Sequence, residues 1–118
     1  MIDEKYIEEL LEFNDGSSLV ALWLWARKYP KFNGDLGKAK EGLFFLAENL
    51  MHKGILRLAN NENFLSGSID DQLNMFRAAW PKEYDEKTEE KDIDNLWWYL
   101  FAPAGAVWIY SDGSEVWT

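Results

Sequence analysis

The sequence predicts an α+β domain in which about four N-terminal helices pack on a small antiparallel sheet. In residues 1–81, apolar side chains recur at the spacing of helix turns, between residues that commonly begin and end helices. From residue 96 on, aromatic and β-branched runs surround Asp112-Gly113, a dipeptide that strongly favours a β-hairpin. Helices followed by strands, without alternation, are typical of α+β domains. The length of 118 residues suits a single domain, 1–118.

The first two predicted helices differ in how much of their surface is apolar. The first follows Asp3, which can cap it, carries charged residues on one face, and ends at residues 14–16. The second begins at residues 17–18 and ends before Pro30. Its run Leu19–Ala26 is apolar on all sides, which predicts a central, buried helix. A strand is the competing interpretation of this short run.

The third helix is predicted from a capping residue and an apolar stripe. Asp35 can cap a helix that runs to about Lys53 and stops at Gly54. Lys38 and Lys40 lie near the positive end of its dipole, which predicts a salt bridge to an acidic neighbour. The stripe comprises Leu36, Ala39, Leu43, Leu46, Ala47, Leu50 and Met51.

An additional strand and a fourth helix are expected next. Residues 55–59 read as the strand and residues 60–63 as a turn. Ser68 and Asp71 form a capping-box pattern before the helix, which ends before Pro81. Its apolar face comprises Ile69, Leu73, Phe76 and Trp80. The hydrophilic residues 82–94 predict a solvated, mobile connection to the sheet.

Residues 96–118 predict a three-stranded meander whose first strand is the aromatic run 96–101. With Asp112-Gly113 as a two-residue turn, Trp108 pairs with Trp117 across the hairpin. One face then comprises Trp108, Tyr110 and Trp117, and the other comprises Val107, Ile109 and Val116. Because both faces carry apolar groups, we expect both to be covered, and loss of Trp117 to weaken the fold.

Composition and charge limit the classes of function. The chain lacks cysteine and has one histidine, so it can form neither a disulfide framework nor a thiolate or histidine-rich metal site, and we expect no cofactor. Its longest apolar run has eight residues, and its N-terminus is unlike a secretory signal, so we expect a cytoplasmic protein that does not bind membranes. The net charge of −9 disfavours nucleic-acid binding. It favours a basic protein partner, or it only keeps a Trp-rich domain soluble.

No pattern in the sequence predicts catalysis. A nucleophile elbow, a phosphate loop, a dinucleotide fingerprint and zinc-ligand spacing are all absent. His52 lies near the end of the third helix, where a cation is favourable, and Asp70 and Asp71 suit a helix N-terminus. Carboxylate pairs between residues 89 and 94 lack the apolar surroundings that raise a carboxyl pKa. We therefore expect no enzymatic activity. Helices followed by a strand and a hairpin also resemble a winged-helix DNA-binding domain. The third helix has few Arg, Lys, Asn or Gln side chains that could contact DNA bases, which disfavours this interpretation.

The acidic stretch before Trp97 and Trp98 is the best candidate for a partner-binding surface. Charged groups around aromatic anchors are common in tight protein interfaces. One alternative is a solvated linker followed by core tryptophans, and another is a small-ligand pocket lined by Trp97, Trp98 and Trp108. The predicted binding residues are Glu83, Asp85, Glu86, Glu89, Glu90, Asp92, Asp94, Trp97 and Trp98.

Several motifs occur in an order found in one known family. They are GILRLA at 54–59, FLSGSIDDQ at 64–72, FRAAWP at 76–81, LWW at 96–98, PAGAVWI at 103–109 and DGSEVWT at 112–118. Together they resemble the small acidic bacterial proteins of domain-of-unknown-function family 596. Most of these motifs form caps, turns and core, so the partner-binding surface need not lie on them.

The resemblance implies a cytoplasmic bacterial protein without catalytic residues. It also implies an immunity protein of a toxin–immunity locus, including contact-dependent growth-inhibition systems. Such a protein binds and neutralises the toxic C-terminal domain of a cognate effector. An acidic, cofactor-free domain suits the capture of a basic toxin domain.

Overall fold

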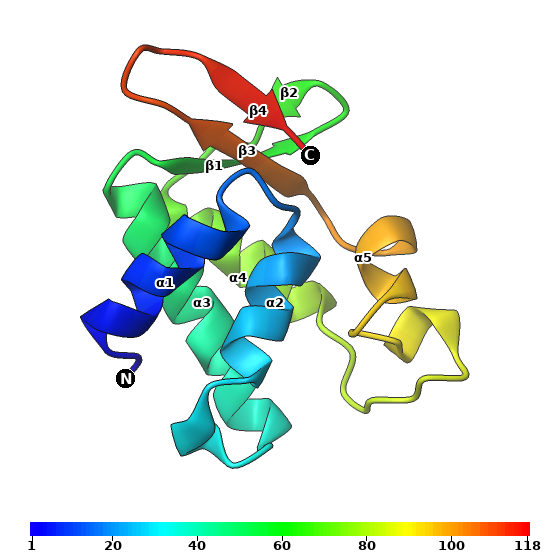
Figure 1. Ribbon diagram of the computed structural model, residues 1–118. Coiled ribbons are helices and arrows are strands. Elements are labelled where there is room, and N and C mark those ends of the chain that lie inside the picture. The colour runs from blue at the N-terminus through cyan, green and yellow to red at the C-terminus, as the bar shows by residue number, and fades with distance from the viewer.

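The computed structural model describes residues 1–118 and confirms the α+β class: five α-helices carry a four-stranded antiparallel sheet at one end (Figure 1). None of the five helices combines the length and the hydrophobicity that crossing a membrane requires. In chain order the elements are α1 Glu4–Asn14, α2 Leu19–Arg27, the 3-10 turn η1 Pro30–Phe32, α3 Leu36–His52, β1 Leu56–Asn60, β2 Asn63–Phe64, α4 Ile69–Ala79, the 3-10 turn η2 Glu89–Lys91, α5 Leu96–Leu100, β3 Gly105–Ile109 and β4 Glu115–Trp117.

Local capping explains why three helices begin where the sequence predicts. The carboxylates of Asp3 and Asp35 each accept a hydrogen bond from a backbone N–H in the first turn of α1 and α3, at 3.0 and 2.9 Å. The predicted capping box at residues 68–71 begins α4. The salt bridge predicted for Lys38 or Lys40 is absent, because neither ammonium group has a carboxylate within 4.0 Å.

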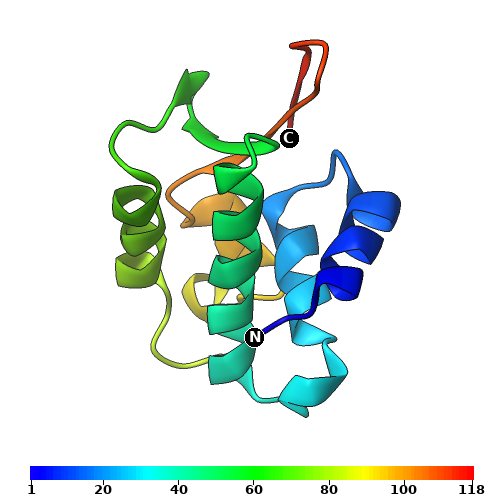
Figure 2. The ribbon, with the colours of Figure 1, turned by 90° about the vertical axis from the view of Figure 1, so that its left-hand side faces the viewer.

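Helix α3 is the centre of the helical layer. It packs between α2 and α4 and leads into β1 (Figure 2). The run at 19–26 is confirmed as helix α2, which buries Leu22 and Trp23 completely. The chain after α2 approaches α3 closely at Gly42, where an added Cβ would lie 2.6 Å from a ring carbon of Phe32. A larger residue at position 42 would therefore collide with the core.

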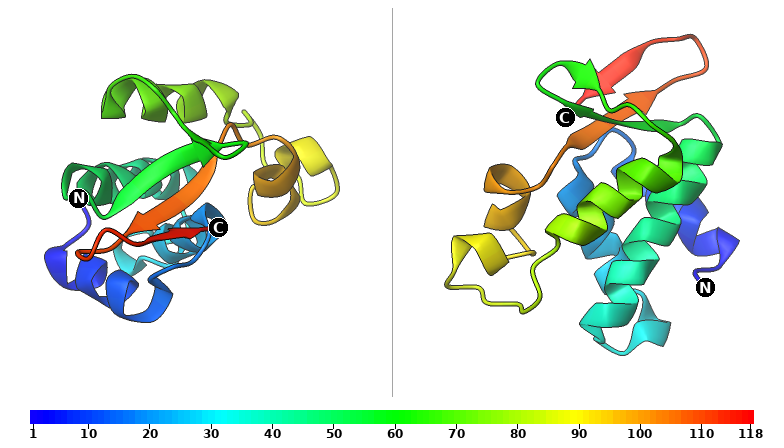
Figure 3. Two further views of the ribbon diagram at one scale, coloured as in Figure 1. Left: turned by 90° about the horizontal axis from the view of Figure 1, so that it is seen from above. Right: turned by 180° about the vertical axis from the view of Figure 1, so that it is seen from behind.

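The sheet has the strand order β2-β1-β3-β4, and all neighbouring strands are antiparallel. The strand predicted at 55–59 is confirmed as β1, and its Leu56 pairs with Trp108 of β3. These two residues and Leu58 are buried on the face that lies over the ends of the helices (Figure 3, left). The strand β2 follows the predicted turn. Its two residues are too few to show the alternation of apolar and polar residues from which a strand is predicted.

Residues 96–101 form helix α5 and its C-terminal cap, not the predicted first strand of a meander. The carbonyl oxygen of Asp92 accepts the backbone N–H of Trp97 at 3.0 Å, which begins the turn. A strand would send Trp97 and Trp98 to opposite faces. The helical turn instead allows both rings to pack on Trp80, with ring centroids 5.3 and 5.8 Å away. Packing on the end of α4 therefore overrides the β-preference of these aromatic residues.

The predicted hairpin register is wrong by one residue. Trp117 pairs with Val107, not with Trp108. The loop has three residues, 111–113, of which only Gly113 has a positive φ, at 86°. A two-residue type I′ turn needs positive φ at both central residues, whereas a three-residue loop needs it only at the last. The single glycine therefore suits the longer loop.

The changed register moves Trp117 to the outer face of the sheet, away from the helices. Its ring centroid lies 5.2 Å from that of Phe64, and the guanidinium of Arg57 lies 3.6 Å from the centroid of the same Phe64 ring. Trp117 is 44% exposed. Val107, which pairs with Trp117 on the same face, is only 1% exposed, so the prediction that both faces of the hairpin are covered holds at Val107 and is wrong at Trp117.

Candidate functional site

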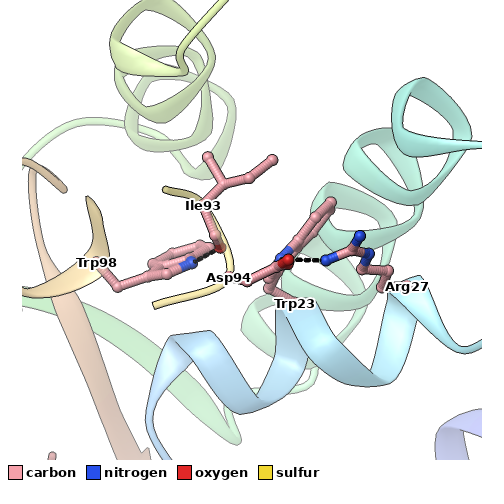
Figure 4. A network of polar contacts seen from close by, with 5 residues as sticks. All are labelled: Trp23, Arg27, Ile93, Asp94 and Trp98. Carbon is pink, nitrogen blue, oxygen red and sulfur yellow. Dashed lines mark hydrogen bonds and ion pairs between the residues drawn. The ribbon is translucent and has the colours of Figure 1, made fainter. Parts of the chain in front are cut away.

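The acidic connection between α4 and α5 is anchored at its C-terminal end, contrary to the prediction of a solvated segment. The carboxylate of Asp94 accepts hydrogen bonds from the indole N–H of Trp23, at 2.9 Å, and from the guanidinium of Arg27 (Figure 4). The indole N–H of Trp98 donates to the carbonyl oxygen of Ile93 at 2.6 Å. These contacts tie the connection to α2 and α5, so residues 93 and 94 belong to the fold.

Three other predicted binding residues also have structural roles. Asp92 and Trp97 are buried, at 7% and 1% exposure, so neither is available to a partner in this conformation. Asp85 accepts hydrogen bonds from the N–H of Lys87 at 2.9 Å and from the hydroxyl of Thr88 at 2.8 Å. These two hydrogen bonds hold the pKa of Asp85 below its usual value. Asp85 therefore shapes the turn that leads to η2.

The pocket predicted around Trp97, Trp98 and Trp108 is not formed. Trp108 has no exposed surface, and its indole N–H donates to the carbonyl oxygen of Ser17 at 2.7 Å. Trp98 lines a cavity of only about 10 Å³ with seven other apolar residues, which is smaller than a small organic ligand requires. Trp97 and Trp108 are core residues and Trp98 packs half-buried against the core, close to the alternative interpretation of core tryptophans.

Four predicted acidic residues do lie exposed on the connection: Glu83, Glu86, Glu89 and Glu90. We call these four side chains the acidic rim. None of them forms a salt bridge with a lysine or arginine of the chain. Their negative charge is therefore available to a partner. Acidic and histidine side chains do not gather anywhere in groups of three that could hold a metal ion.

The structure adds an apolar surface that the strand prediction concealed. On α5 and its C-terminal cap, Leu96, Tyr99, Leu100 and Phe101 are 37, 68, 56 and 46% exposed. We call these four side chains the α5 patch. Residues 96, 99 and 100 have helical spacing, so assigning 96–101 to a helix would have revealed one outward-facing stripe. The sequence therefore contained this helical spacing, but the many aromatic residues of 96–101 favoured the prediction of a strand.

The α5 patch lies next to the part of the acidic rim that η2 carries. The turn η2, which carries Glu89 and Glu90, packs directly against α5 (Figure 1). Four large exposed apolar side chains thus lie on α5 and its cap, and the adjacent turn carries two exposed carboxylates that form no salt bridge in the chain. Monomeric proteins seldom leave such clusters exposed unless they bind something. This is a small α+β protein with exposed apolar side chains on α5 beside exposed carboxylates on η2.

Comparison with known proteins places the chain in a family. The chain belongs to the family described as "Protein of unknown function, DUF596", whose model matches residues 51–118. The chain is also similar to the solved structure of an uncharacterized protein conserved in bacteria, from Neisseria meningitidis, with a TM-score of 0.78 and 30% sequence identity. The match covers 97% of this chain and 90% of that chain. No curated protein matches the chain. The family predicted from the motifs is confirmed.

Proposed function

We propose that the chain is a cytoplasmic immunity protein that binds the toxic domain of a cognate effector and neutralises it without catalysis. The observation that carries this proposal is the α5 patch beside the acidic rim. The resemblance of the chain's motifs to small acidic bacterial proteins of this kind supports the same function.

The α5 patch has the composition of an interface centre. Aromatic anchors surrounded by charged groups are where binding free energy concentrates in protein complexes. Tyr99 presents a large ring that is 68% exposed, next to Leu100 at 56%. Covering such side chains stabilises a complex by about 25 cal/mol for each Å² of apolar surface removed from water.

The acidic rim specifies the charge of the partner. Residues 82–94 contain seven acidic residues and three lysines, so the segment has a net charge of −4. Such a surface attracts a basic partner from a distance and raises its association rate. A toxin domain that acts on nucleic acid would carry the complementary positive surface, because it must neutralise phosphates.

Protection of cells that express the cognate toxin domain tests the proposal. The double variant Tyr99→Ala/Leu100→Ala is expected to weaken the complex by about 2 kcal/mol or more, about 30-fold in Kd, and to reduce protection. The matched control is Phe13→Ala on α1, because Phe13 has the same 68% exposure as Tyr99 but lies outside the α5 patch. Phe13→Ala should protect as well as the wild type.

Charge reversal tests the acidic rim separately. The triple variant Glu86→Lys/Glu89→Lys/Glu90→Lys is expected to lower the association rate about tenfold, with weaker salt dependence than the wild-type complex. Asp85 is left unchanged because it holds the turn. The control, with the same change in net charge, is a triple reversal at three exposed positions elsewhere: Glu8, Glu12 and Glu62. Full protection by both the patch variant and the rim variant would contradict the proposed surface, and failure of the wild type to protect would contradict the function.

A further inference from the structure

A second concavity, of about 390 Å³, lies between the start of α3, the end of α4 and the residues that follow α4. Its volume falls within the range of pockets that hold small molecules. It combines Lys40 of α3 and Arg77 of α4 with Trp80, Lys82 and Tyr84. These residues come from segments that are distant in sequence, so the fold builds the pocket.

Cationic side chains line the pocket in a chain whose net charge is −9, while burial and the nearby acidic residues Asp92, Glu86 and Asp85 raise the pKa of its Tyr84. Three cationic side chains line it, and no acidic residue does. Lys40 and Lys82 form no salt bridge. The only carboxylate near Arg77 is that of Glu41, whose Oε2 lies 3.6 Å from Nη2, and the Glu41 side chain is half exposed. Lys40 and Lys82 therefore lack the acidic partners that neutralise such groups when their role is structural, whereas Arg77 shares its charge with the half-exposed Glu41.

The pocket also offers aromatic rings with unused hydrogen-bond donors. Five of the seven tryptophan indole N–H groups donate to an acceptor in the protein, and those of Trp80 and Trp97 do not. The Trp80 ring is held by the rings of Trp23, Phe44, Trp97 and Trp98, whose centroids are 5.2, 5.9, 5.3 and 5.8 Å away, and it is left half-buried at the pocket. The hydroxyl of Tyr84 likewise has no hydrogen-bond partner, although the side chain is half-buried. Both groups are open to water, which an acceptor atom of a ligand would replace.

We propose that this pocket binds a small phosphorylated molecule with a planar group, of the size of a nucleoside monophosphate. The phosphate would lie against Lys40, Arg77 and Lys82, because lysine and arginine are the side chains that bind phosphate through charge-assisted hydrogen bonds. The planar group would contact Trp80 and Tyr84. This site does not involve the partner of the proposed function, so either can be correct without the other.

Titration calorimetry of the full chain with adenosine monophosphate tests the site. The wild type is expected to bind, and Lys40→Ala/Lys82→Ala to bind about tenfold or more weakly, because two charge-assisted hydrogen bonds are lost. Arg77 is left in place because it also packs over the ring of Phe44, 4.5 Å from the centroid. Glu41→Gln is expected to bind more tightly than the wild type, because Arg77 is freed from its competing carboxylate.

The control with the same change in charge is Lys5→Ala/Lys28→Ala, at two exposed lysines without salt bridges. This variant should bind as the wild type does, and thermal unfolding shows whether each variant is folded. In a ¹⁵N-labelled chain, adenosine monophosphate should shift the indole N–H resonance of Trp80, which the Trp80→Phe variant identifies.

Three results would overturn the proposal. The first is no binding at millimolar adenosine monophosphate. The second is equal weakening in the control variant, which would indicate general charge attraction. The third is binding of inorganic phosphate as tight as that of the nucleotide, which would remove the role of the aromatic rings.

Discussion

Replacing Asp94 with alanine is expected to lower the free energy of unfolding by about 3 kcal/mol. Trp23 is fully buried, so without Asp94 its indole N–H would lack an acceptor, which costs about 2 kcal/mol. The ion pair with Arg27 adds about 1 kcal/mol only, because the side chains of Arg27 and Asp94 are 33 and 22% exposed and water replaces part of the contact.

Thermal unfolding followed by circular dichroism measures this loss. Unfolding entropies of about 2.1 cal/mol/K per residue convert 3 kcal/mol in a 118-residue chain to a decrease in Tm of about 12 °C. Asp94→Asn keeps an oxygen acceptor for Trp23 and loses the charge, so its Tm should fall by about 4 °C. An alanine variant that unfolds within about 2 °C of the wild type would refute the reasoning.

Three further predictions concern packing and protonation. Gly42→Ala should lower the free energy of unfolding by about 1–3 kcal/mol in urea titrations, because its Cβ would lie 2.6 Å from the ring of Phe32. Trp108→Ala should cost about 3–5 kcal/mol and Trp117→Ala about 1 kcal/mol in thermal unfolding, because Trp108 is fully buried and Trp117 is 44% exposed. Burial, with a smaller effect of nearby Glu9, raises the pKa of Tyr6 from 10.0 to about 12. The unfolded chain therefore loses this proton first, so stability that is complete below pH 10 should decline between pH 10 and 12, with a shallower decline in Tyr6→Phe.

Each of these predictions has an outcome that contradicts it. Unchanged stability of Gly42→Ala would mean that the Phe32 ring can shift without cost. Equal losses for the two tryptophan variants would mean that the outer face of the sheet is covered in solution. A decline at alkaline pH that is as steep in Tyr6→Phe as in the wild type would assign the pH dependence to another group.

The sequence alone determined the features that depend on near neighbours in the chain. Asp3, Asp35 and the capping box at 68–71 satisfy the first N–H groups of their own helices, so a few residues suffice to locate each helix start. The apolar face of α3 was likewise predicted from apolar residues at helical spacing, and the strand β1 from a short run of apolar residues between turn residues. The α+β class and the family were also readable from the sequence, because they are sums of such local signals.

Only the tertiary structure decided the candidate site. Whether the residues at 96–101 form a strand or a helix depends on Trp80, which offers Trp97 and Trp98 a common packing surface. Charge could not separate Asp94, which belongs to the fold, from Glu86, which is exposed, because the difference lies in contacts with a helix some 70 residues earlier in the chain. The hairpin register likewise depended on backbone angles that a dipeptide does not specify. Composition shows which side chains are available, but exposure and pairing are set by contacts between segments that are distant in sequence.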